Sequence, residues 1–213
     1  MLMLLMSAAL ILAQVAGADQ PVDAAGPTTA AEVAQVPAAI IQIEDEINDY
    51  TRADLVRRFR EARELGAKAI VLEINSYGGA ALAGLETSRF IKQQNDIKVM
   101  AFIREKAISA GAMIAVACDG IWMSPHSFIG DAGVIAMAPG GGMQELGELE
   151  RAKVESPIVE DFRDSAARNG YSTLLLESMV VVGREVYYIE DEQGNRRFVD
   201  GAAQMARPLE LCA

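Results

Sequence analysis

The sequence predicts an α/β fold with parallel strands. Short apolar segments alternate along the chain with segments of helical pattern, which is typical of strand–helix–strand units. The run 69–74 is almost continuously apolar, as expected for a strand with both faces covered. The chain has 213 residues, of which 51% are hydrophobic, so it can build one globular domain with a substantial core. We therefore expect a single α/β domain with short extensions.

The first predicted units follow one another from residue 39. Thr51 is predicted to cap the first helix, with Asp54 at the third position of a weak capping box. Gly66 closes this helix, because a glycine commonly follows the last helical turn. The other units expected up to residue 123 are strands 39–43, 69–74, 97–103 and 120–123 and helices 82–93 and 109–118.

The pattern changes after Asp131. Residues 138–142 are rich in glycine and predict a loop. Ser156 is predicted to cap a helix that has Pro157 at its first position, where proline is tolerated. A shorter helix over 173–180 and a hairpin with strands 186–189 and 197–199 around Gly194-Asn195 complete the prediction.

The two ends of the chain differ from the central domain. Residues 1–18 are apolar apart from Ser7 and Gln14, and Ala16-Gly17-Ala18 resembles a cleavage site, which indicates a secretory signal or an uncleaved anchor. We therefore expect an exported, extracytoplasmic or membrane-associated protein. The predicted organisation is a signal or anchor over 1–18, a flexible linker over 19–37, a domain over 38–200 and a tail over 201–213.

Charge and cysteine content exclude several classes. The chain carries 19 Lys and Arg against 30 Asp and Glu, for a formal net charge of −11, which argues against nucleic-acid binding. Its cysteines are Cys118 and Cys212, and no disulfide is expected between them. No His, Cys and carboxylate cluster has metal-ligand spacing, so neither a metal nor an organic cofactor is expected.

Two motifs follow neighbouring predicted strands. Residues 75–79 end in Gly78-Gly79, and residues 104–109 end in Ser109. The carboxyl ends of parallel strands meet at one edge of a sheet, where ligands bind in such folds. A serine at the start of a helix lies near free N–H groups, and glycine permits close approach of another amide. This pattern indicates an acyl-transfer site in which two amides stabilise an oxyanion.

A serine nucleophile needs a base. The one histidine, His126, follows a short strand and is better interpreted as a surface or turn residue. A lysine kept neutral is the alternative. Lys106 lies three residues before Ser109, but its neighbours Arg104 and Glu105 indicate an exposed turn. Lys153 lies 44 residues after Ser109, in a charged run that is equally typical of a solvated surface.

Residues 39 to about 180 resemble the serine–lysine peptidases of the NfeD type. These are related to signal peptide peptidase A and, more distantly, to the Clp protease subunit. The resemblance implies a Clp protease/crotonase-like spiral of β-β-α units with a C-terminal helical segment and a β-hairpin. The motifs that carry it, in order, are Ile74-Asn-Ser-Tyr-Gly-Gly79, Ala107-Ile-Ser-Ala-Gly-Ala-Met113, Ala117-Cys-Asp-Gly-Ile-Trp-Met-Ser-Pro125 and Phe128-Ile-Gly-Asp-Ala-Gly133.

This resemblance implies roles for individual residues. Ser109 matches the nucleophile and Lys153 the general base, and the position of a catalytic histidine in other relatives falls near Ala132. The oxyanion donors would be the N–H groups of Gly79 and Ala110. Tyr77 and Gly78 would contact substrate, although Tyr77 stands where the family usually has proline and leaves the turn less rigid.

The implied activity is a serine endopeptidase with a Ser-Lys dyad. Its substrates would be hydrophobic segments of membrane or exported proteins, with a stomatin-like protein as partner, and the chain would form a homo-oligomer. Two alternatives stay open at this point. One is a catalytically inactive scaffold or partner-binding protein of the same fold. The other is a crotonase-like acyl-CoA enzyme, which needs no serine nucleophile and would bind CoA.

Overall fold

The computed structural model describes residues 35–137, 142–144, 146–190 and 193–201. A parallel sheet with strand order β1-β2-β3-β4 forms its centre, and β5 pairs with the end of β3. The strands of this sheet are β1 (Ala38–Ile47), β2 (Ala69–Gly79), β3 (Lys98–Ile108), β4 (Gly120–Met123) and β5 (Phe128–Gly130). The helices are α1 (Asp49–Glu64), α2 (Ala81–Lys92), α3 (Ala110–Ala117), α4 (Glu148–Asn169) and α5 (Thr173–Ser178). The predicted alternation of strands and helices is confirmed.

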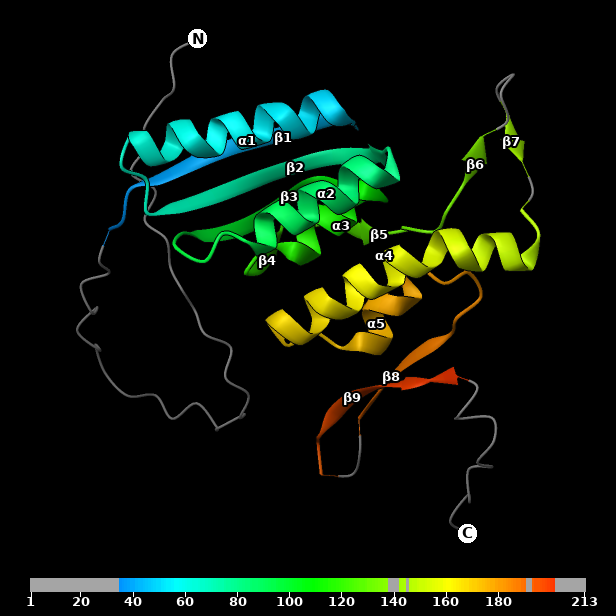
Figure 1. The fold of residues 1–213 in the computed structure, drawn as a ribbon. Coiled ribbons are helices and arrows are strands. Elements are labelled where there is room, and N and C mark those ends of the chain that lie inside the picture. Colours follow the sequence, from blue (N-terminus) through cyan, green and yellow to red (C-terminus); the bar gives the residue numbers. More distant parts are fainter. Residues whose placement is uncertain (1–34, 138–141, 145, 191–192, 202–213) are drawn as a thin grey trace.

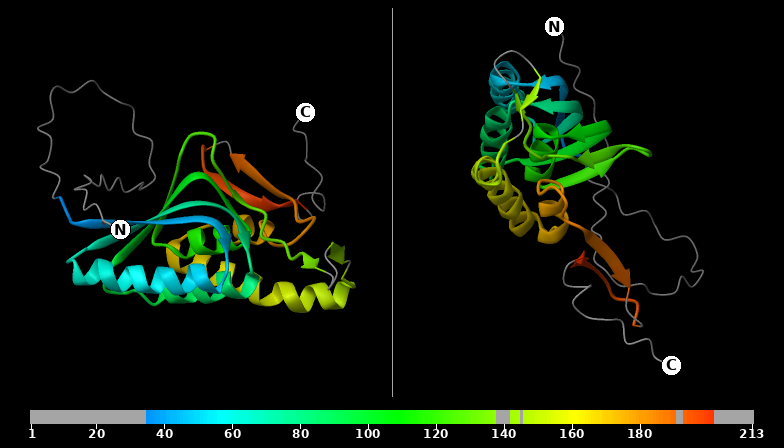
Figure 2. Two further views of the ribbon diagram at one scale, coloured as in Figure 1. Left: turned by 90° about the horizontal axis from the view of Figure 1, so that it is seen from above. Right: turned by 90° about the vertical axis from the view of Figure 1, so that its right-hand side faces the viewer.

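The helices cover one face of the sheet (Figures 1 and 2). Along β1 the side chains alternate between the two faces: Ile41 and Ile43 are buried, whereas Ile40 is 47% exposed. The expectation that β2 has both faces covered is therefore wrong for the described residues. Alternate residues of β2 are only partly buried, and its apolar run reflects burial against helices on one side.

The first helix is capped by Asn48 rather than by Thr51. The Asn48 side-chain oxygen accepts hydrogen bonds from the N–H groups of Tyr50 (3.0 Å) and Thr51 (3.1 Å). Asn48 has extended backbone angles, as an N-cap requires. The Thr51 hydroxyl instead donates to the Glu46 carbonyl (2.9 Å). Asparagine and threonine both cap helices well, so the sequence pattern did not separate them.

Strands β2 and β3 are each five residues longer than predicted at the end that carries a motif. Ser76 pairs with Ala107 across β2 and β3, and residues 106–108 pair with 128–130 of β5. Residues 78 and 79 pair with the end of β1. The polar and glycine-rich motifs are therefore strand ends rather than free turns, because neighbouring backbones satisfy their hydrogen bonds.

Helix α4 begins at Glu148, eight residues before the predicted start at Ser156. Gly147 occupies the N-cap position, and Glu148 and Glu150 place acidic groups in the first turn, which favours a helix N-terminus. Pro157 lies inside the helix. Proline has no N–H, so it leaves the Lys153 carbonyl without its helical partner. In Figures 1 and 2 the part of α4 before Pro157 extends beyond the sheet.

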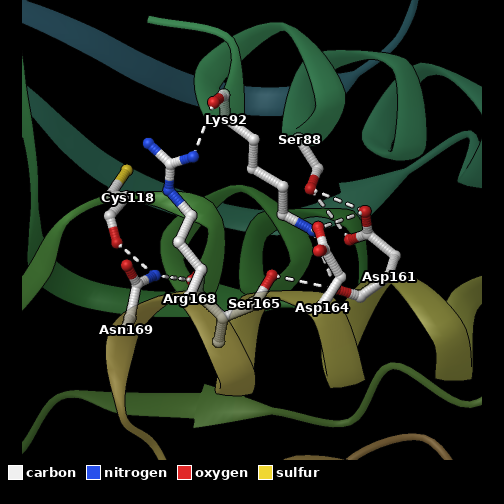
Figure 3. A network of polar contacts seen from close by, with 9 residues as sticks. Ser88, Lys92, Cys118, Asp161, Asp164, Ser165, Arg168 and Asn169 are labelled. Carbon is white, nitrogen blue, oxygen red and sulfur yellow. Dashed lines mark hydrogen bonds and ion pairs between the residues drawn. The ribbon is translucent and has the colours of Figure 1, made fainter. Parts of the chain in front are cut away.

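The other half of α4 is fastened to α2 (Figure 3). The Lys92 ammonium lies 2.9 Å from Asp161 Oδ1 and 2.9 Å from Asp164 Oδ2, and its side chain is 9% exposed. The Ser88 hydroxyl donates to the Asp161 carboxylate (2.8 Å), and Asn169 donates to the Cys118 carbonyl (2.8 Å). The apolar side chains of the same half are buried; they are Ile158, Phe162 and Ala166.

The C-terminal part of the described chain contains the predicted short helix and hairpin. Ser172 caps α5 through a hydrogen bond to the Leu175 N–H (3.3 Å). Strands β8 (Val186–Glu190) and β9 (Arg196–Asp200) form an antiparallel pair, as predicted. A further two-stranded pair consists of β6 (Ala136–Met137) and β7 (Met143–Gln144). The predicted loop 138–142, except for Gly142, and the predicted signal over 1–18 lie outside the described residues.

Candidate functional site

Ser109 lies at the junction of β3 and α3 with a strained backbone. Its angles are φ 54° and ψ −118°, a conformation that L-residues rarely adopt. Such strain at a strand-to-helix turn is how several hydrolase folds expose a nucleophilic hydroxyl. The neighbouring residues are small and buried, including Ala107, Ala110 and Gly111, so the backbone can turn sharply there.

Backbone hydrogen bonds hold Ser109 in this conformation. Its N–H donates to the Gly130 carbonyl of β5 (3.0 Å), and its carbonyl accepts from the N–H groups of Ala112 (2.9 Å) and Met113 (3.2 Å). The Ser109 hydroxyl does not cap α3, and within the described residues it makes no hydrogen bond. Ser109 is partly exposed. A hydroxyl that is fixed but unbonded is available to react.

Gly78 packs directly against Ser109. A methyl group placed on its Cα would lie 2.6 Å from Ser109 Cβ and 2.7 Å from the Ile108 carbonyl oxygen, closer than van der Waals contact allows. Gly78 also has φ +99°, which favours glycine. Gly79 approaches β1 in the same way, since a methyl group there would lie 2.1 Å from the Ile47 carbonyl oxygen. Both glycines are therefore required for close backbone contact.

Ser76 organises the end of β2. Its hydroxyl accepts a hydrogen bond from the Gly78 N–H (3.0 Å) and donates one to the Asp45 carbonyl of β1. The Ser76 side chain is 1% exposed. Ser76 is part of the motif at the end of β2, and the predicted site gives it no role of its own. A small hydroxyl residue two positions before a positive-φ glycine is the signal that could have identified it.

The two predicted oxyanion donors belong to the elements that surround Ser109. Ala110 is the first residue of α3, so its N–H has no partner within the helix. Gly79 follows Gly78, which contacts Ser109. The structure thus brings the Gly78-Gly79 end of β2 to the serine, as the sequence predicts.

Lys153, by contrast, is not joined to Ser109. It lies in the N-terminal half of α4 and is exposed, and within the described residues no hydrogen bond or ion pair joins it to another group. Two residues along a helix correspond to a rotation of about 200°. Lys153 therefore lies opposite Glu155, which begins the buried stripe of α4. Because α4 begins at Glu148, the predicted helix start beside Lys153 is also wrong.

Lys106 has a different environment from the predicted exposed turn. It belongs to β3, its side chain is 15% exposed, and its ammonium lies 4.5 Å from the centre of the Tyr77 ring. It also lies 3.4 Å from the Glu105 carboxylate. The error arose because β3 continues past residue 103, and Ala107 and Ile108 could have indicated that continuation.

His126 and Cys118 play no part in this arrangement. His126 is exposed in the turn after β4, with φ 67°, as expected for a turn residue. Cys118 is buried with a free thiol, and burial raises the pKa of that thiol well above its usual range. The position that would hold a histidine, Ala132, is buried.

Two cavities flank the segment that carries Ser109. The first, of about 650 Å³, lies at the ends of β1, β2 and β3, and many of its lining residues are charged; it is lined by Glu44, Asp45, Glu46, Asn75, Tyr77, Gly78, Gly79, Arg104 and Lys106. The second, of about 280 Å³, follows β5 and is mostly apolar; it is lined by Asp131, Gly133, Val134, Ile135, Ala136, Gln144, Leu146, Arg151 and Val182. Ser109 contacts Gly78, which lines the first cavity. It also donates a hydrogen bond to Gly130, the residue before Asp131 of the second cavity.

Sequence comparison finds relatives that are described as membrane proteins and proteases. The chain is 29% identical to the membrane protein NfeD1b of Bacillus subtilis over 125 residues, 59% of this chain and 28% of that protein. It is 27% identical to the membrane-bound protease PH1510 of Pyrococcus horikoshii over 146 residues, 66% of this chain and 32% of that protein. The chain thus spans less than a third of these relatives. Among the described residues, none of the helices is both long and apolar enough to span a bilayer.

The fold matches solved structures of the 1510-N membrane-bound stomatin-specific protease. A serine-to-alanine mutant superimposes with a TM-score of 0.57 at 24% identity, covering 68% of this chain and 69% of that one. A lysine-to-alanine mutant in complex with a substrate peptide gives a TM-score of 0.58 at 24% identity, with 68% and 65% covered. The expected α/β fold, with a parallel sheet, a C-terminal helical segment and a β-hairpin, is confirmed. The family model for the NfeD1b N-terminal domain matches residues 37–204, and the chain belongs to this family.

Proposed function

We propose that this protein is a serine endopeptidase that cleaves hydrophobic segments of membrane or exported proteins. The observation that carries the proposal is Ser109: a strained strand-to-helix serine with an unbonded hydroxyl, in close contact with Gly78. In the proposed reaction the Ser109 oxygen attacks a peptide carbonyl carbon. The N–H groups of Gly79 and Ala110 donate hydrogen bonds to the resulting oxyanion, which is the group they are suited to stabilise.

Lys153 is the proposed base. As a neutral amine it takes the Ser109 proton, forming an ammonium, and then returns that proton to the leaving amine when the C–N bond breaks. Water next attacks the acyl-enzyme ester and gives a proton to the amine. The ammonium returns this proton to the Ser109 oxygen as the ester C–O bond breaks, which releases the peptide acid and restores the Ser109 hydroxyl. Atoms and charges balance without a metal or another co-reactant.

The proposal requires Lys153 to move, since it is exposed and lies opposite the buried stripe of α4. We propose that α4 bends at Pro157, because the missing N–H weakens the helix between residues 153 and 157. The half of α4 after Pro157 stays fixed through Asp161 and Lys92. Substrate in the apolar cavity beside Arg151 would favour the rearranged state.

The relatives support this assignment of substrate. Solved structures of a stomatin-specific protease include a serine mutant and a lysine mutant, the latter with a substrate peptide. We also propose that the partner is a stomatin-like membrane protein and that the chain is associated with a membrane. The further proposals are that the chain forms a homo-oligomer and that its protease domain spans residues 38–200. Tyr77 and Gly78, which line the larger cavity beside the site, are the proposed substrate contacts.

The experiment is cleavage of apolar peptides, including C-terminal segments of stomatin-like proteins, by the full chain. Wild type is compared with Ser109→Ala, Lys153→Ala and Lys153→Arg, and with Lys98→Ala as a control on an exposed lysine. Cleavage activity is expected to fall by at least about 10³-fold in Ser109→Ala and Lys153→Ala, because removing either member of a catalytic pair abolishes the function of both. The same loss is expected for Lys153→Arg, because arginine stays charged and cannot act as a base. Equal activity of Ser109→Ala and wild type contradicts the proposal.

The second candidate function is an inactive partner-binding protein. The position of Lys153 on the exposed side of α4 favours it. This function predicts that wild type and Ser109→Ala bind an apolar peptide with the same Kd and that neither cleaves it. Cleavage by wild type alone excludes the inactive form.

A further inference from the structure

We propose that Lys106 and Tyr77 form a clamp between β3 and β2 that positions Gly78-Gly79 beside Ser109. The inference rests on the proposed function, because the segment it positions is the proposed oxyanion site. Lys106 and Tyr77 act here as positioning residues: neither touches the reacting atoms in the proposed mechanism.

The contact itself is specific. The Lys106 ammonium lies 4.5 Å from the Tyr77 ring centre, within the range of a favourable cation–π interaction. Tyr77 is 74% exposed, so this contact is not a by-product of core packing. The Lys106 side chain is only 15% exposed, so it lies against the protein beside the ring rather than extending into solvent. Among the described residues, the other group paired with this ammonium is the adjacent Glu105.

The clamp lies at the point where the residue pairs between β2 and β3 end. The residue pairs between these strands end at Ser76 and Ala107. Beyond that point the pairs of β2 are to β1 alone, at residues 78 and 79. The Lys106–Tyr77 contact is thus diagonal: it joins Tyr77, one residue beyond the last pair on β2, to Lys106, the residue before Ala107 on the strand that leads to Ser109.

The segment beyond Tyr77 pairs with β1 and packs against Ser109, and the Lys106–Tyr77 contact adds a side-chain link to β3. Gly78 has φ +99°, and two successive glycines have a wide choice of backbone conformations. A tyrosine at position 77 does not restrict its own backbone as proline would. A side-chain contact at this position therefore limits the motion of the Gly79 amide relative to Ser109, and misplacement of a catalytic group by about 1 Å reduces rates by up to about 10²-fold.

A replacement that keeps the positive charge distinguishes a positioning role of Lys106 from base catalysis. Arginine preserves a cation–π contact with tyrosine but cannot be deprotonated near neutral pH. Phenylalanine at position 77 likewise keeps the ring face. Glu44, Asp45 and Glu46 line the same cavity, so a cation at position 106 also faces a favourable field.

The test measures kcat and KM for peptide cleavage by the full chain. Lys106→Met should lower kcat about threefold to tenfold with a smaller change in KM. Tyr77→Leu should lower kcat to the same extent and also raise KM, because Tyr77 is a proposed substrate contact. The kcat of the double variant should be no lower than that of either single one, as expected for one shared contact. Lys106→Arg and Tyr77→Phe should recover at least half of the wild-type kcat. Lys98→Met, on the exposed start of β3, is the matched control.

Two results overturn the clamp. If Lys106→Arg is as inactive as Lys106→Met, Lys106 is a base rather than a positioning residue. If Lys106→Met and Tyr77→Leu are additive, the two side chains act separately. Thermal unfolding of each variant checks that a loss of kcat is not a loss of fold.

A measurement without activity separates this inference from the proposed function. In a Ser109→Ala background, Lys106→Met should accelerate hydrogen exchange of the amides in residues 77–79 about fivefold, with no change in β1 or in α4. Faster exchange in this background, together with no peptide cleavage by the chain that keeps Ser109, retains the clamp and rejects the peptidase. Unchanged exchange rejects the clamp, whatever the activity.

Discussion

At the scale of single residues, the strained backbone of Ser109 is the clearest sign of selection for something other than stability. Its φ of 54° and ψ of −118° would suit glycine, yet the chain has a serine there. The hydrogen bond from Ser109 N–H to the Gly130 carbonyl fixes this geometry, and Gly78 leaves room for it. Backbone strain that persists at a residue with a partly exposed hydroxyl is consistent with a functional role for Ser109.

Ser109→Gly should therefore be more stable than Ser109→Ala. Glycine relieves a strain of about 1–3 kcal/mol and loses about 0.5–1 kcal/mol through its own backbone entropy, so a net gain of about 1 kcal/mol is expected. Alanine keeps the strain. Denaturant unfolding of both variants and wild type checks this, and both variants should lack peptidase activity. Equal stability of the two variants would show that the surroundings do not strain this residue.

At the scale of elements, α4 has two halves with different roles. The half after Pro157 is buried and fastened to α2 through Lys92 and Asp161 (Figure 3). The half before Pro157 extends past the sheet and exposes Leu149 (72%) and Lys153. A fixed half joined to a free half at a proline allows the free half to change position without unfolding of the core.

Lys92→Met should destabilise the protein by about 3 kcal/mol, because it leaves the Asp161 carboxylate largely buried without its cation. Most of this loss should be recovered in Lys92→Met/Asp161→Leu, where neither charge is left. Denaturant unfolding measures both. Lys98→Met, which removes an exposed lysine, should change stability by less than about 0.5 kcal/mol. A double variant no more stable than the single one would show that packing, not charge, dominates here.

The segment after α4 contains a tyrosine with an unsatisfied hydroxyl. The Tyr171 oxygen is buried, and within the described residues it has no hydrogen-bond partner. Burial, and to a lesser extent the nearby Cys118 and Asp119, raise the pKa of Tyr171 to about 12. The folded state thus keeps the phenol proton to higher pH than the unfolded state, where the pKa is about 10. Stability from this difference is complete below pH 10 and is lost between pH 10 and 12.

Tyr171→Phe should remove this alkaline loss and should raise stability at pH 7 by about 1 kcal/mol, because no buried hydroxyl is left unbonded. Urea unfolding at pH 7 and at pH 11 measures both effects relative to wild type. Tyr50→Phe, at a tyrosine that is 87% exposed, is the control and should change neither. A Tyr171→Phe protein that is less stable at pH 7 would indicate a hydrogen bond to water at this hydroxyl.

At the scale of the whole molecule, the β8–β9 hairpin is attached to the central domain mainly through charged side chains. Glu177 of α5 is 4% exposed and accepts hydrogen bonds from Arg163 and Arg184. Arg184 also bonds Asp200 of β9 (3.1 Å). A two-stranded hairpin has little stability of its own, so these contacts decide whether it stays in place.

Glu177→Gln should loosen the hairpin without unfolding the central domain. Trypsin cleavage at Arg196 or Arg197 should become about fivefold faster, which corresponds to about 1 kcal/mol in local opening. Glu160→Gln is the control, since Glu160 also contacts Arg163 but is 65% exposed. Cleavage rates followed by mass spectrometry distinguish the two. An unchanged rate for Glu177→Gln would mean that apolar contacts hold the hairpin.

The order of strands and helices, the helix that follows Ser109 and the hairpin around Gly194 were all predictable from local pattern. Each depends on hydrophobic periodicity or on turn residues within a few positions. The contact of Gly78 with Ser109 followed from parallel pairing, because two strands that are neighbours in a sheet end at the same edge.

Other features depend on contacts between residues far apart in the chain. The length of β2 and β3 and the contact of Lys106 with Tyr77 involve partners that strand pairing brings together. Helix α4 begins at Glu148 although Pro157 removes one of its backbone hydrogen bonds, and its C-terminal half packs on α2. Local pattern determines which element a segment forms. Packing determines where that element ends and which side chains reach the serine, since those contacts span many residues of sequence.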